Sequence, residues 1–178
     1  NDYWQYYHSL TGRRGVTVAA AKNLMRSRPT LIAAVMVARG EADALLTGIV
    51  GRFHKKLGYV RSVLPLEPRV SSTSAMTGVI NQQGVFFFVD THVQEDPTAE
   101  QICEATLQAA YRMKLFGIEP KVALLSHSNF GSHDSRDAVK MRQVRELLRK
   151  RNPRLNVDGE MQGDTALSAA ARKLVLPH

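Results

Sequence analysis

Apolar residues in the first part of the chain recur every three or four positions, the spacing of helices with one buried face. A first helix is predicted from Thr17 to about Pro29, since proline cannot continue a helix. Its buried face collects Val18, Ala21, Leu24 and Met25. The apolar residues 31–40 predict a second helix that closes at Gly40, and residues 52–64 predict a third, basic helix.

One apolar segment between these helices has a different character. Residues 42–50 read ADALLTGIV, and glycines stand at positions 40, 48 and 51. Because glycine suits the tight turns at the ends of a buried strand, a short strand is predicted here. Pro65 and Pro68 then resist both helix and sheet. We therefore expect residues 1–66 to be part of a first α/β domain and residues 67–178 to be a second, both incomplete.

Beyond these prolines, predicted strands and helices alternate. Residues 79–80 and 85–89 are strands on either side of a hairpin turn at residues 81–84. A helix follows, with Asp96 as its N-cap, Pro97 at its first position and Gly117 beyond its end. The remaining elements are a strand at 121–125, a helix at 135–150, a strand at 155–157 and a helix at 165–174. This alternation predicts a layered α/β fold with at least some parallel sheet.

Composition and charge narrow the class of protein. The hydrophobic fraction is 44%, yet no apolar stretch approaches the roughly 20 residues of a membrane span, so no membrane partner is expected. Cys103 is the only cysteine, which excludes an internal disulfide and favours a cytoplasmic protein. The first residues, NDYWQYYHSL, lack the features of a signal peptide and suggest the middle of a longer protein. Lys and Arg exceed Asp and Glu by 24 to 16, mostly in the first third, which indicates an anionic partner.

Polar clusters follow three of the predicted strands, at residues 90–92, 126–132 and 158–164. Ligands of parallel α/β sheets gather at the carboxyl ends of the strands. The second cluster, SHSNFGS, offers hydroxyls, an amide and close backbone approach through Ser126, Ser128, Asn129, Gly131 and Ser132. A helix N-terminus after this turn would favour an anion such as phosphate. The alternative is a hydrogen-bonded turn that only caps the helix.

Other candidate groups have structural alternatives too. Asp158, Glu160 and Asp164 could serve acid-base chemistry or a metal, but Asp90, Asp158 and Asp164 also precede or begin predicted helices, where aspartate is commonly a cap. The histidines show no zinc-ligand spacing with the lone cysteine. No metal site is therefore expected. Arg142, Arg145 and Arg149 share one face of a predicted helix, which could touch nucleic acid. Without stacking aromatic residues, this face is better interpreted as a solvated one, and no nucleic-acid partner is expected.

An ordered set of segments resembles one known family. The segments are ARGEADALLTGIV, VSSTSAM, FFFVDTHVQEDPTAEQICEATLQAA, GIEPKVALLSHSNFGS and VDGEMQGDTAL. Together they resemble the phosphate acetyltransferases, and more closely the phosphotransacetylase-like C-terminal domain of hybrid NADP-dependent malic enzymes. The similarity runs from about Tyr3 to Leu176.

The resemblance implies a two-domain phosphotransacetylase-like α/β fold with mixed and parallel sheets, present here as a fragment. It also implies a ligand cleft between the domains, affinity for acetyl-CoA or CoA, and a homo-oligomer that is a dimer or larger. On this basis the residues expected to line an acetyl-CoA or phosphate cleft are Ser126, Ser128, Asn129, Phe130, Gly131, Ser132, Asp158, Gln162 and Arg52.

Departures from the family pattern suggest that the acetyl-transfer activity has been lost. Where the transferases carry Ser/Thr-Thr and then a phosphate-binding Arg-Pro, this chain has Arg52-Phe53 and Gly58-Tyr59, and a second family arginine aligns with Thr11. Transfer of an acetyl group gains mainly from cations that stabilise negative charge. We therefore expect a catalytically inactive regulatory and oligomerisation domain that senses acetyl-CoA. NADP and a divalent metal, Mg or Mn, would be held by N-terminal malic enzyme domains in the same chain.

Three alternatives stay open from the sequence. The chain could be an active phosphate acetyltransferase, with Ser126, Ser128 and Asp158 near the acyl group. It could be a structural oligomerisation module that binds no ligand, or it could bind nucleic acid through its positive charge.

Overall fold

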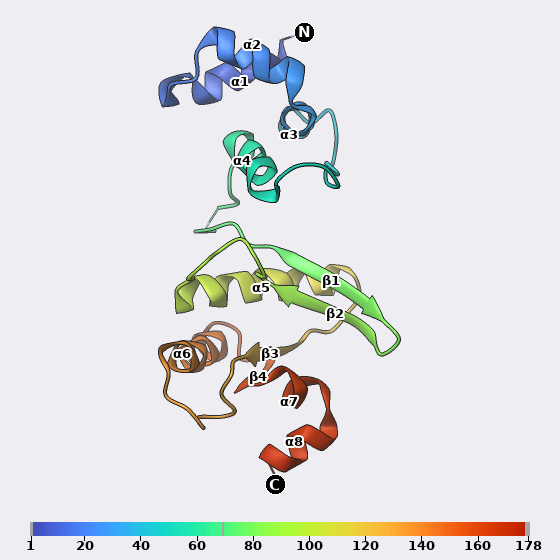
Figure 1. The fold of residues 1–178 in the computed structure, drawn as a ribbon, viewed down its shortest axis with the longest axis vertical. Coiled ribbons are helices and arrows are strands. Elements are labelled where there is room, and N and C mark those ends of the chain that lie inside the picture. The colour runs from blue at the N-terminus through green and yellow to red at the C-terminus, as the bar shows by residue number, and fades with distance from the viewer. Residues whose placement is uncertain (1, 69, 177–178) are drawn as a thin grey trace. The chain divides into compact units, whose positions relative to one another are not determined.

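The computed structural model describes residues 2–68 and 70–176 (Figure 1). The chain divides into two compact units, Asn1–Val70 and Ser71–His178. Helices accompany a small antiparallel sheet and a small parallel sheet. The α/β class predicted from the sequence is therefore confirmed. Within the described residues, no helix combines the length and apolar character needed to cross a membrane.

The first unit is helical. Its elements are α1 (Tyr3–Thr11), the 3-10 turn η1 (Gly12–Arg14), α2 (Val18–Ser27), α3 (Pro29–Ala38) and α4 (Phe53–Val63). The Thr17 hydroxyl caps α2 by accepting the Ala20 N–H at 3.2 Å, and Pro29 begins α3, as expected from its missing N–H. Leu31, Ala34 and Val35 of α3 are fully buried in the centre of this unit. The three predicted helices are confirmed.

The strand predicted at residues 42–50 is wrong. No residue of this segment is in a strand, and the side chains of Leu46 and Ile49 are fully exposed. A strand needs a neighbouring strand to pair its backbone groups, and the described part of the first unit contains none. The segment is held instead by contacts such as the 2.7 Å hydrogen bond from the Lys56 ammonium to the Gly48 carbonyl.

The second unit begins with the predicted hairpin, β1 (Met76–Asn81) and β2 (Gly84–Val89). The Asn81 side chain accepts the N–H groups of Gln83 and Gly84 and so fixes the turn. Helix α5 (Ala99–Leu115) follows, but its N-cap is Thr98, in a capping box with Gln101, and not Asp96 as predicted. The Asp96 carboxylate pairs instead with Arg136 and Lys140, about forty residues further along the chain.

The remaining elements form a parallel pair of strands with a crossover helix. They are β3 (Lys121–Leu125), α6 (Arg136–Arg151), β4 (Asn156–Met161), α7 (Gly163–Leu167) and α8 (Ala169–Val175). Strand β4 pairs with β3 from Lys121↔Asn156 to Leu125↔Met161, so it is longer than the predicted strand at 155–157. The predicted last helix is divided at Ser168, whose side chain caps α8.

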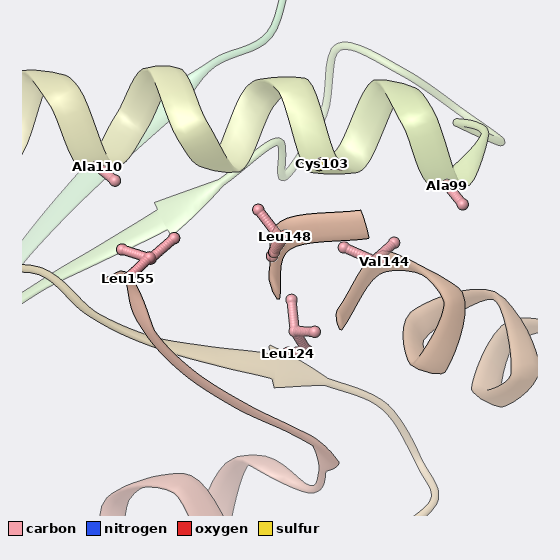
Figure 2. Packing of buried hydrophobic residues seen from close by; sticks show 7 residues of the cluster. All are labelled: Ala99, Cys103, Ala110, Leu124, Val144, Leu148 and Leu155. Atoms are coloured by element: carbon pink, nitrogen blue, oxygen red, sulfur yellow. The ribbon is translucent and has the colours of Figure 1, made fainter. Parts of the chain in front are cut away.

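The core of the second unit lies between α5, α6 and the parallel strands (Figure 2). Cys103 of α5, and Val144 and Leu148 of α6, have no exposed surface, and Leu124 and Leu155 pack with them from the strand side. Burying a side chain of this size contributes about 1.5–3 kcal/mol. This core fixes α6 against β3 and β4, and so sets the geometry of the segments that leave the strands.

Candidate functional site

The parallel pairing brings the SHSNFGS turn, residues 126–132, to the carboxyl end of β4. Ser126 donates its N–H to the Met161 carbonyl at 2.9 Å, and Phe130 donates to the Glu160 carbonyl at 2.8 Å. In return the Gln162 N–H donates to the Asn129 side chain, and the Gln162 amide donates to the His127 carbonyl, both at 2.8 Å. The turn and Gln162, both predicted from the sequence as site residues, therefore form one connected structure.

The backbone of the turn adopts an uncommon conformation. Phe130 and Gly131 have φ angles of 49° and 87°, so two consecutive residues lie in the left-handed region. The Ser132 hydroxyl accepts the Asn129 N–H at 3.0 Å, and the Ser126 hydroxyl accepts the Ser128 N–H at 3.2 Å. Successive backbone N–H groups in such a turn form a concavity that suits an anion.

The anion in this concavity is a carboxylate of the chain itself. Glu160 Oε1 accepts the Gly131 N–H at 2.7 Å and the Ser128 hydroxyl at 3.0 Å. A third bond comes from Arg142 of α6, whose Nη1 donates to the same oxygen at 3.0 Å. Glu160 has no exposed surface, so these bonds are shielded from water. Ser128 and Gly131, predicted as ligand-contacting residues, are therefore bonded to Glu160.

The ionisation of Glu160 follows from these contacts. Burial raises the pKa of its carboxyl group, but the N–H groups of Gly131 and of Glu160 itself, the Ser128 hydroxyl and Arg142 all stabilise the charged form. The hydrogen bonds outweigh burial, and the pKa of Glu160 lies below its ordinary value. Glu160 is therefore a charged anchor for the turn at neutral pH.

The basic face of α6 is not the solvated face predicted from the sequence. Besides Glu160, Arg142 pairs with Asp134, and Arg145 donates from Nη1 to the Gly159 carbonyl at 2.7 Å. Arg149 is the exposed member of the face, with 54% of its side chain accessible. Two of these three arginines therefore join α6 to β4 and to the turn.

A pocket of about 470 Å³ adjoins the turn in the second unit. The residues that line it come from the segment that leads into α5 and the first turn of that helix, from the end of β3 and the start of the turn, and from the first two turns of α6. They are Glu95, Asp96, Pro97, Ile102, Leu125, Ser126, His127, Arg136, Asp137, Lys140 and Met141. Ser126 thus belongs both to the turn and to the wall of a pocket large enough for part of a small ligand.

Other predicted site residues lie apart from this network. Arg52 is exposed at the N-cap position of α4 in the first unit, and Asp158 lies in β4, where its carboxylate accepts the Gly159 N–H. The Asp90 carboxylate accepts backbone N–H groups of Ala75 and Val93 at the base of the hairpin. Among the described residues, no three His, Cys, Asp or Glu side chains gather in a way that could hold a metal ion.

Sequence reasoning missed the partnership of Glu160 and Arg142. Glu160 was considered as an acid or metal ligand, and Arg142 as part of a solvated face. Only the register of β4 against β3, and the packing of α6 over both strands, places the two groups 3.0 Å apart. The available signal was a glutamate between Gly159 and Met161 at the end of β4, but the sequence did not indicate its partner.

Comparisons with known proteins agree with this fold. The family model described as phosphate acetyl/butaryl transferase matches residues 1–178. The NADP-dependent malic enzyme of Haemophilus influenzae is 46% identical over 176 residues, and a phosphate acetyltransferase of Synechocystis is 33% identical over 174 residues. These matches take in 99% and 97% of this chain but only 23% and 25% of the relatives, so the chain spans about a quarter of their length.

A solved structure shows the same arrangement of elements. The phosphotransacetylase from Streptococcus pyogenes superposes with a TM-score of 0.83 and 25% identity, over 99% of this chain and 54% of that protein. The predicted phosphotransacetylase-like fold is thereby confirmed. With the family model matching along its whole length, this chain belongs to the phosphate acetyl/butaryl transferase family.

Proposed function

We propose that this chain is the phosphotransacetylase-like domain of an NADP-dependent malic enzyme, and that it binds acetyl-CoA as a regulatory ligand. The observation that carries the first part is the match to a malic enzyme, which covers 99% of this chain and 23% of that longer protein. The parent protein would oxidise and decarboxylate malate to pyruvate. NADP and a divalent metal, Mg or Mn, would be held by its N-terminal domains.

The SHSNFGS turn supports the second part of the proposal. Glu160 holds the turn from its buried side, so no ligand is needed to shape it. Asn129 and Phe130 are half-buried and Ser132 is exposed, while Ser126 lies in the wall of the pocket. A preformed turn with hydroxyl and amide groups beside a pocket suits a ligand that combines phosphate groups with an acyl chain.

The first unit supports a loss of catalysis. Thr11, which aligns with one family arginine, is buried, and its hydroxyl donates to the Tyr7 carbonyl at 2.7 Å. Gly58 and Tyr59 lie inside α4, and Tyr59 packs against the core of the unit. These positions contribute packing and helix structure where the transferases have phosphate-binding cations, so transition-state stabilisation would be lost while a binding surface is kept.

Regulation would require only a modest energetic difference. If acetyl-CoA binds one arrangement of a homo-oligomer ten times more tightly than another, it shifts that equilibrium by about 1.4 kcal/mol. We therefore propose a cytoplasmic oligomer that has malic enzyme domains in the same chain and acetyl-CoA as its small-molecule partner.

The binding claim can be tested by titrating the intact protein with acetyl-CoA in a calorimeter, with Ser126→Ala compared against Ser9→Ala. The Ser9 hydroxyl bonds to the Tyr6 carbonyl within the first unit and is a matched control. We expect saturable binding that is weaker in Ser126→Ala alone. No binding by the wild-type protein would contradict the proposal.

A second candidate is an active phosphate acetyltransferase, favoured by the 33% identity to an enzyme of that name. It would move the acetyl group between CoA and phosphate. The two candidates differ in one assay: acetyl phosphate formation from acetyl-CoA and phosphate by the intact protein. Turnover would favour the transferase, and binding without turnover would favour the regulatory domain.

A further inference from the structure

A lysine is held inside the pocket beside the turn. Lys140 projects from the second turn of α6, and only 15% of its side chain is accessible. Its ammonium group lies 2.6 Å from Asp96 Oδ1 and 3.5 Å from Asp137 Oδ1. A largely buried cation of this kind is stable only with an anionic partner.

The main partner, Asp96, comes from a different segment. Asp96 lies outside any helix or strand, in the bend before α5, and 52% of its side chain is accessible. Its second oxygen lies 2.7 Å from Arg136 Nη2, so one carboxylate bridges two cations of the first turns of α6. The hydrogen bond from Lys140 and the charge of Arg136 lower the pKa of Asp96.

We propose that Lys140 and Arg136 form a binding subsite for a phosphate group, and that Asp96 occupies this subsite when no ligand is bound. The proposal rests on the function proposed above and deepens it, by assigning recognition of a phosphate of the ligand to α6 and not to the first unit. An exposed bend can move away from α6 at less cost than a helix or strand.

The surroundings of the subsite select the class of ligand. Glu95 and Asp137 also line the pocket, so a single carboxylate has little advantage over Asp96. A phosphate dianion carries more charge and three terminal oxygens, and can bond both cations at once. Ile102, Leu125 and Met141 supply apolar walls, and Ser126 joins the pocket to the turn. The geometry thus fits a phosphate attached to a partly apolar chain.

Two pairs of variants test the subsite. Lys140→Met removes the buried cation, and Lys150→Met removes an exposed lysine of the same helix. Asp96→Asn removes the competing carboxylate, and Glu146→Gln removes a carboxylate of α6 that pairs with Arg145 and Arg149, away from the pocket. Lys140→Arg keeps the positive charge and tests whether a different cation at this position retains binding.

Binding is measured on the intact protein by two probes: calorimetry with acetyl-CoA, and amide NMR shifts with inorganic phosphate alone. We expect Lys140→Met to weaken binding of both about tenfold or more, since a charge-assisted hydrogen bond is lost. Asp96→Asn should tighten binding about two- to fivefold, because it removes a partly exposed competitor. Lys140→Arg should retain binding, and both controls should match the wild type.

The outcomes separate this inference from the proposed function. If acetyl-CoA binds but neither Lys140→Met nor Asp96→Asn changes its affinity, the subsite is wrong and the regulatory proposal stands. If phosphate shifts the amides of α6 but acetyl-CoA does not bind, the proposed function is wrong and the subsite stands. If Asp96→Asn lowers the melting temperature without tightening phosphate binding, Asp96 only stabilises the fold through its ion pairs, and the inference is overturned.

Discussion

Replacing Glu160 by glutamine tests whether this buried carboxylate holds the turn. The substitution keeps the size of the side chain and an oxygen acceptor, but it removes the charge that receives bonds from Gly131, Ser128 and Arg142. With its oxygen in the place of Oε1, glutamine also puts an amide N–H₂ in the place of Oε2, a buried atom that has no hydrogen-bond partner among the described residues. The arrangement of α6, β4 and the turn should therefore become less stable.

The magnitude follows from the burial of the two charged partners. Glu160 has no exposed surface, whereas 26% of the Arg142 side chain is accessible. Breaking a fully buried pair costs about 3–5 kcal/mol, but Arg142 can turn partly to water and keeps Asp134 as a partner. The bonds from the Gly131 N–H and the Ser128 hydroxyl also change from charge-assisted to neutral, while the bond from Arg142 loses the negative charge of its acceptor. We expect a loss of about 2–3 kcal/mol in the free energy of unfolding.

The matched control is Asp134→Asn, which removes the other carboxylate paired with Arg142. Asp134 is 84% exposed, so its contribution should be below about 1 kcal/mol. Urea unfolding at neutral pH, followed by circular dichroism, measures both variants. Trp4, the only tryptophan, lies in the first unit, so its fluorescence does not report on this site. Equal effects of the two substitutions, or a loss below about 0.5 kcal/mol in Glu160→Gln, would show that Glu160 does not hold the turn.

Three further predictions concern the stability at low pH, the backbone at Gly159 and the burial of Leu148. Because the pKa of Glu160 is lower in the folded than in the unfolded state, its stabilisation is complete above the unfolded value of about 4.3 and is lost as pH falls through the folded value. Acid titrations of unfolding free energy should therefore show a smaller loss below that pH in Glu160→Gln than in the wild type. Gly159→Ala should lower the free energy of unfolding in urea by about 2 kcal/mol or more, because φ is +123° and an added Cβ would lie 2.7 Å from the Leu124 carbonyl oxygen. An unchanged urea midpoint would contradict the close contact between β3 and β4 at this residue. Leu148→Ala should cost about 2–5 kcal/mol in the same assay, and an effect as small as that of an exposed leucine such as Leu174 would contradict its burial in the core.

Local signals explain which elements could be predicted from the sequence. Thr17, Pro29 and the Asn81 turn act on backbone groups within four residues, so their roles follow from side-chain chemistry alone. The strand predicted at 42–50 was wrong because a strand depends on a partner strand, and the composition of the segment does not show whether a partner exists. The prediction of Asp96 as an N-cap was wrong for a related reason. Thr98 caps α5, while Asp96 pairs with cations of α6 that are distant in the sequence.

The candidate site was predictable in its place but not in its contacts. The rule that polar clusters meet at the carboxyl ends of parallel strands brought the SHSNFGS turn and Gln162 together, as found. The same rule did not indicate that Glu160 would point into the turn from the buried side. That contact depends on the strand register and on α6, which are set by the core.

The most direct test of the regulatory claim is malate-dependent reduction of NADP by the intact protein, titrated with acetyl-CoA. We expect acetyl-CoA to inhibit the reaction at saturating malate, and Ser126→Ala to shift the inhibition to higher acetyl-CoA concentration without changing the uninhibited rate. Malate oxidation that proceeds at the same rate at every acetyl-CoA concentration would contradict it.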